Sequence, residues 1–88
     1  MLAFLLPAFV LKALSALGQK FHTYVQLLED PQVIYACQER RSAEILLHVE
    51  FLGIGDFHYI YTVNWDAQEN ITAAELEKTE VVNQGNLN

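Results

Sequence analysis

AEILLHVEFLGIGDFHYIYTVNW, residues 43–65, is the stretch that decides the fold. On both sides of its glycines, apolar and polar side chains alternate with a period of two, and β-branched and aromatic residues dominate the second half. The segment Gly53-Ile54-Gly55 fits a three-residue hairpin loop that ends on a glycine with positive φ. The stretch therefore predicts two antiparallel strands, over residues 43–52 and 56–65.

This loop also determines which residues of the two strands face each other. The cross-strand pairs that it predicts are Phe51 with Phe57, Val49 with Tyr59 and Leu47 with Tyr61. The odd-numbered positions then form the more apolar face, which we expect to be buried. The even-numbered face is mixed, and the same register places Glu50 opposite His58.

A third alternating segment lies upstream, over residues 32–38. With a turn at Glu39-Arg40-Arg41, the predicted pairs are Cys37 with Ala43 and Tyr35 with Ile45. Cys37 then faces the core, where a free cysteine behaves as a small apolar residue. The middle of the chain is therefore predicted to be a three-stranded antiparallel meander.

The N-terminal segment 1–17 is apolar except for Pro7, Lys12 and Ser15. From Val10 to Leu28 apolar residues recur three and four apart, as in an amphipathic helix. The apolar run stops at Lys12, short of the roughly 20 residues that a membrane-spanning helix needs. A cleaved signal peptide is disfavoured because no basic residue precedes the run and the pattern continues to Leu28. We expect a retained helix beginning at Pro7, with residues 1–6 as an apolar arm or a kinked extra turn.

The C-terminal segment begins with a helix start signal. Thr72-Ala73-Ala74-Glu75 matches a capping box, and Ile71 and Leu76 are placed as a hydrophobic staple. The sequence thus predicts a short helix ending near Val82 and a flexible tail over residues 83–88. The expected fold is a single α+β domain, residues 1–82, with the order α-β-β-β-α.

Composition limits the classes of partner. The chain of 88 residues is 52% hydrophobic, more than one small core can bury, which favours a protein partner or a homo-oligomer, with a dimer preferred. Its net charge of −6 argues against nucleic acid, because such binding depends on Lys and Arg. The single cysteine excludes an internal disulfide. The candidate contact residues are Leu2, Phe4, Leu5 and Phe9 of the N-terminal segment, and Ile34, Leu46 and Ile60 of the even face.

One group of side chains could carry chemistry. His48, Glu50 and His58 share the even face, where they could bind zinc or a related metal, or form a proton-transfer pair. The alternative is a cross-strand Glu–His pair on a hydrated face, because H-x-E in a strand is a weak signal. The sequence carries no recognised catalytic motif and implies no cofactor.

These patterns favour a small acidic protein–protein interaction module without catalytic activity, such as an accessory subunit, adaptor or inhibitor, that self-associates. One alternative is a peripheral membrane protein attached through the N-terminal helix, although only Lys12 and Lys20 would serve its polar face. The other is a small metal-binding protein or enzyme using His48, Glu50 and His58. We expect a cytoplasmic protein, or one peripheral to a membrane.

Overall fold

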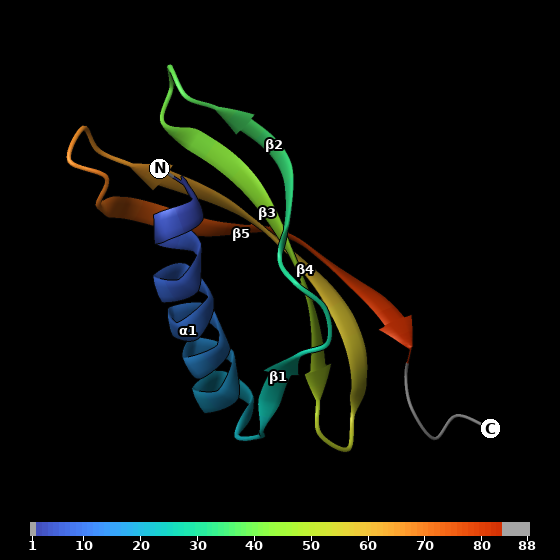
Figure 1. Ribbon diagram of the computed structural model, residues 1–88. Coiled ribbons are helices and arrows are strands. Elements are labelled where there is room, and N and C mark those ends of the chain that lie inside the picture. Colours follow the sequence, from blue (N-terminus) through green and yellow to red (C-terminus); the bar gives the residue numbers. More distant parts are fainter. Residues whose placement is uncertain (1, 84–88) are drawn as a thin grey trace.

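The computed structural model describes residues 2–83, and the side-chain surroundings of residues 6–82. Its elements are α1 (Leu2–Phe21), β1 (Val25–Leu27), β2 (Gln32–Cys37), β3 (Ser42–Phe51), β4 (Gly55–Trp65) and β5 (Ile71–Asn83). One helix therefore precedes five strands, which form a single antiparallel sheet (Figure 1). The predicted order α-β-β-β-α is wrong, because the chain is mostly β and the described part of its C-terminal segment is a strand.

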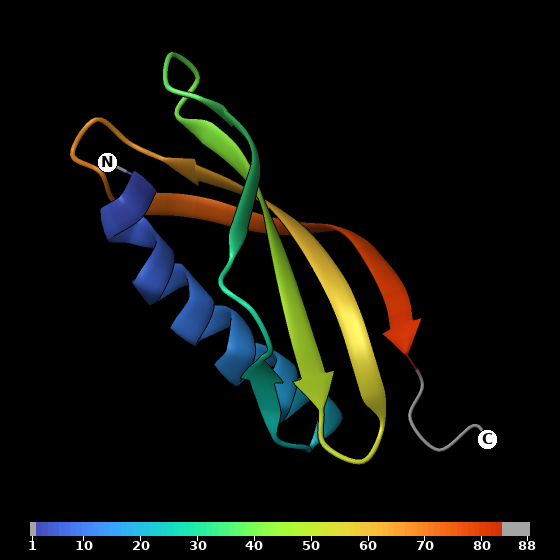
Figure 2. The ribbon, with the colours of Figure 1, turned by 45° about the vertical axis from the view of Figure 1, so that its right-hand side comes forward.

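The sheet has the order β1-β3-β4-β5, and β2 pairs with the other end of β3. Consequently β1 and β2 share one edge of the sheet, while β5 forms the opposite edge. The helix lies along one face, with its N-terminal end near the β4–β5 turn and its C-terminal end near β1 (Figures 1 and 2). The opposite face carries no second layer within the described residues.

The β3–β4 hairpin has the predicted loop length, but the loop comprises residues 52–54, one position earlier than expected. Phe51 therefore pairs with Gly55 rather than with Phe57, and the other pairs slide by two residues. Because a shift of two keeps the side-chain alternation, the odd-numbered face remains the buried one. Gly53, with φ of 81°, supplies the left-handed conformation inside the loop.

A β-bulge between Val33 and Tyr35 changes the register of β2 against β3. The extra residue reverses the faces beyond it, so that Cys37 pairs with Ser42, and Ala36 takes the place opposite Ala43. The prediction that Cys37 faces the core is therefore wrong, since it lies half-buried on the even face of β3.

The helix begins earlier and ends earlier than the sequence pattern indicated. It starts at Leu2, so that Pro7 lies inside it. It ends at Phe21, where His22 adopts a φ of 54° and the N–H of Thr23 donates to the carbonyl of Gly18 at 3.2 Å. This is the Schellman arrangement that stops a helix. The following residues pair with the end of β3 as β1, instead of continuing the helix to Leu28.

The predicted C-terminal helix is replaced by β5. Three register irregularities interrupt its pairing with β4. The residues that pair with the buried side of β4 are Ile71, Ala74, Leu76, Thr79 and Val81. Their separations alternate between three and two, because each bulge adds a residue. This spacing hides the period of two that would reveal a strand.

The core lies between α1 and the odd-numbered face of β3 and β4. Ala43, Ile45, Leu47 and Val49 are completely buried in it. The helix contributes Phe9, Val10, Ala13 and Leu17. On the other face, the even-numbered residues of β3 and β4 are all half-buried, as expected for a sheet covered by a helix on one side only.

Candidate functional site

The uncovered face brings the two predicted histidines together. His48 of β3 pairs directly with His58 of β4, and their rings meet edge to face with centroids 4.9 Å apart. Nδ1 of His48 lies 2.7 Å from a carboxylate oxygen of Glu29, which belongs to the β1–β2 connection. Nε2 of His48 is buried without a hydrogen-bond partner and lies 3.9 Å from Oδ2 of Asp56.

Glu50, the third predicted member, shares this face but pairs with other residues than the two histidines. The register places it opposite Asp56 rather than His58, and its Oε1 accepts a hydrogen bond from the side-chain amide of Gln26 at 2.7 Å. His58 is instead 4.0 Å from Glu80 of β5, a carboxylate that also pairs with Lys78 at 3.0 Å. Glu29 and Glu80 could not be found from the alternation pattern, because the first is in a connection and the second in the strand taken for a helix.

Each histidine therefore has its own carboxylate neighbour, Glu29 for His48 and Glu80 for His58. Among the residues that the structure describes, no group of three or more His, Cys, Asp or Glu side chains is arranged to hold a metal ion. What the arrangement offers is one histidine–carboxylate hydrogen bond, between His48 and Glu29, and two longer contacts at 3.9 and 4.0 Å on a half-exposed face. The hydrogen bond is of the kind that orients an imidazole ring. Metal binding by His48, Glu50 and His58 stays a prediction, for which the described residues show no arrangement of three ligands.

The predicted contact residues occupy three different surroundings. Leu46 and Ile60 pair directly and form a half-buried apolar spot on the even face. Ile34 is not beside them, because it lies at the β2 bulge and Gln32 takes the position opposite Leu46. Phe9 is only 4% exposed and belongs to the core, so its side chain is not available at the surface. The side chains of Leu2, Phe4 and Leu5 lie outside the described residues.

The two edges of the sheet differ in chemistry. At one edge, β2 exposes Val33, Ile34 and Tyr35, and the strand carries no charged residue. At the other edge, β5 is exposed over residues 72–82 and carries four charged residues: Glu75, Glu77, Lys78 and Glu80. Charged side chains are a common means by which edge strands avoid pairing with other chains. By this criterion β5 is protected and β2 is not.

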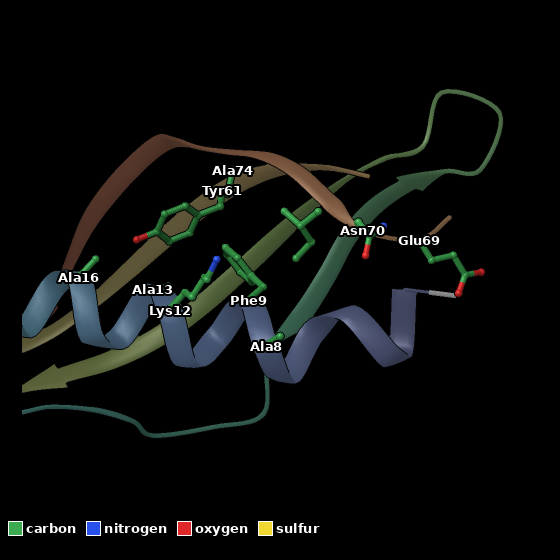
Figure 3. A pocket seen from close by; sticks show the side chains of 10 residues that line it. Ala8, Phe9, Lys12, Ala13, Ala16, Tyr61, Glu69, Asn70 and Ala74 are labelled. Atoms are coloured by element: carbon green, nitrogen blue, oxygen red, sulfur yellow. The ribbon is translucent and has the colours of Figure 1, made fainter. Parts of the chain in front are cut away.

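A cavity of about 490 Å³ lies between α1 and the β4–β5 hairpin (Figure 3). Its helix side is formed by Ala8, Phe9, Lys12, Ala13 and Ala16, and its strand side by Tyr61, Glu69, Asn70, Ile71 and Ala74. The Phe9 and Tyr61 rings, both in its lining, meet edge to face with centroids 5.2 Å apart. Burial, with the neighbouring Tyr59 as a second cause, raises the pKa of Tyr61, so its hydroxyl stays protonated at neutral pH.

A smaller hollow, of about 430 Å³, lies on the other flank of the helix. Its lining is apolar: Leu6, Pro7, Val10, Leu11, Leu27 and Pro31. No helix in the described part of the chain combines the length and hydropathy needed to cross a bilayer.

Comparison of this chain with protein-family models, with curated proteins and with solved structures found no match in any of the three.

Proposed function

We propose that this protein is a small interaction module that self-associates, with two copies pairing through the free edges of their β2 strands. The observation that carries the proposal is the difference between the two edges of the sheet. Ile34 and Tyr35 are 50% and 55% exposed on an uncharged edge strand. The bulge leaves Ile34 without a pairing partner on β3. The Ile34 and Tyr35 side chains both present apolar surface beside a free strand edge.

Charge favours a second copy as the occupant of this edge. Each chain carries a net charge of −6, so two copies repel each other over most orientations. The uncharged β2 strand is the edge at which that repulsion is least. Pairing through β5 would instead bring the three carboxylates Glu75, Glu77 and Glu80 of each copy close to those of the other, with only Lys78 to offset them, and nearby like charges destabilise a strand pair.

Charges at the ends of β2 support an antiparallel pairing. Asp30 precedes the strand and Arg40 follows it, and both are exposed. An antiparallel pair centred near Tyr35 would place Asp30 of each copy beside Arg40 of the other. A two-fold axis produces both contacts at once, as in most dimers of identical chains.

Light scattering after size exclusion, in detergent-free buffer, tests the proposal. We expect the unsubstituted chain to have the mass of two copies. Ile34→Lys introduces a charge at the unprotected edge and is expected to give the mass of one copy. Val81→Lys is the matched control, because Val81 is similarly exposed, at 53%, on the opposite edge strand. This variant should remain a dimer.

Far-UV circular dichroism on the same samples verifies that both variants keep the fold. A single-copy mass for the unsubstituted chain would refute self-association. An unchanged dimer in Ile34→Lys would refute the β2 edge as the contact, and the Leu46–Ile60 spot would become the surface to test next.

A further inference from the structure

We propose that the cavity between α1 and the β4–β5 hairpin binds a small molecule with an apolar body and one carboxylate group, such as a medium-chain fatty acid. The cavity lies on the helix side of the sheet, away from the β2 edge. The proposal is therefore independent of self-association.

The size and lining of the cavity define the body of the ligand. A volume of about 490 Å³ falls within the range of about 300–1,000 Å³ that is typical of small-molecule sites. Phe9, Ala13 and Ile71 provide apolar surface in the lining, and the Tyr61 ring adds aromatic surface. Such a surface favours an alkyl or aryl group over a sugar or a nucleotide.

The small residues on both sides keep the cavity open. Ala8, Ala13 and Ala16 line the helix side and Ala74 lines the strand side, so no long apolar side chain from these positions fills the space (Figure 3). A larger residue at any one of them would occupy volume that a ligand needs. The cavity thus follows from side-chain size at known positions, which makes it testable by filling.

The charged end of the ligand is specified by Lys12. Its side chain rises from α1 toward the strands, with its nitrogen on the side of Tyr61 and Ala74 (Figure 3). It is the one basic residue among the described residues that line the cavity. The Glu69 carboxylate, also in the lining, lies at the other end of the view. A single ammonium group in a largely apolar lining suits one carboxylate, because the ammonium donates charge-assisted hydrogen bonds to it.

Isothermal titration calorimetry with octanoate and with the neutral 1-octanol tests the inference. Octanoate is expected to bind with saturation and more tightly than octanol. Lys12→Met keeps the apolar stem and removes the charge, so we expect it to weaken octanoate binding about tenfold or more and to leave octanol unaffected. Lys20→Met, the same change on the same helix but outside the cavity lining, should bind octanoate as the unsubstituted protein does.

A second pair of variants tests the location. Ala74→Phe would fill the cavity from β5 and is expected to abolish octanoate binding. Ala73→Phe places the same side chain on the opposite face of β5, where Ala73 pairs with Asn64, and should not affect binding. Thermal melts establish that the variants are folded.

Three results would overturn the inference. The first is the absence of saturable octanoate binding to the unsubstituted protein. The second is octanol binding as tightly as octanoate, or equal weakening by the two lysine variants, since either would remove the role of Lys12. The third is octanoate binding that survives Ala74→Phe, which would place the ligand elsewhere.

Discussion

At the scale of single residues, Asp66 organises the turn that produces β5. Its Oδ1 accepts hydrogen bonds from the backbone N–H groups of Asn70, at 2.9 Å, and Gln68, at 3.0 Å. Its own N–H donates to the carbonyl of Asn70 at 2.9 Å. These contacts, chiefly the one from the Asn70 amide, lower the pKa of Asp66. The turn matters because it returns the chain along β4, which overrides the capping signal at Thr72-Ala73-Ala74-Glu75.

We expect Asp66→Ala to lower the free energy of unfolding at neutral pH, and the difference from the unsubstituted protein to shrink in acid. The folded-state pKa of Asp66 lies below its unfolded value. Its ionised form therefore stabilises the fold above the unfolded pKa, and this contribution is lost as the pH falls through the folded pKa. Urea unfolding over an acidic pH series measures the effect. Asp30→Ala, at an exposed aspartate in the β1–β2 connection, is the control and should show a smaller difference. Equal effects of the two substitutions would contradict this role of Asp66.

At the scale of elements, α1 is the one whose limits differ most from its sequence pattern. Pro7 was expected in the first turn, with residues 1–6 as an arm or a kinked extra turn; the helix begins at Leu2 and contains the proline. Proline inside a helix removes a hydrogen bond to the carbonyl four residues earlier and crowds that carbonyl, at a cost of about 3 kcal/mol. Leu6, immediately before the proline, nevertheless packs against the core.

Pro7→Ala is therefore expected to stabilise the protein by about 1–3 kcal/mol, since alanine restores the missing N–H group and relieves the crowding. Urea denaturation measures the change. Pro31→Ala is the matched control, because Pro31 lies in a connection outside any helix. There the substitution should be neutral or should destabilise by up to about 1 kcal/mol, through the greater freedom of the unfolded chain. A loss of stability in Pro7→Ala would contradict the prediction that the proline strains α1.

At the scale of the whole molecule, one helix covers one face of a sheet and leaves the other half-exposed. The molecule measures 48 × 22 × 18 Å, and its described core is a single layer between α1 and the odd-numbered residues of β3 and β4. A core this small leaves little reserve stability. The excess of apolar residues over what that layer buries appears at the β2 edge and in the hollows beside α1.

We expect Leu47→Ala to destabilise the domain by about 2–5 kcal/mol, because Leu47 is completely buried at the centre of this layer. Urea or thermal unfolding measures the loss. Leu52→Ala, at an exposed position of the β3–β4 loop, should change stability by no more than about 0.5 kcal/mol. Similar losses in both variants would contradict the arrangement of the core.

The alternation of residues 32–65 determined three of the strands to within a residue at each end, and it identified Leu47 and Val49 as buried. Alternation is a local property that survives a shift of two in register, and so the faces of β3 and β4 were correct although their pairs were not, whereas the bulge reversed the second half of β2. The amphipathic spacing after Val10 likewise identified a helix but not its ends.

Only the tertiary structure decided the pairing of His48 with His58, the outward position of Cys37 and the strand over residues 71–83. Each depends on a bulge or a turn, which inserts a residue without a strong signal in composition. The cavity also required the fold, because Lys12, Tyr61 and Ala74 meet only when α1 lies across the sheet. The sequence by itself thus determined which residues can be buried, whereas long-range packing decided which of them face each other.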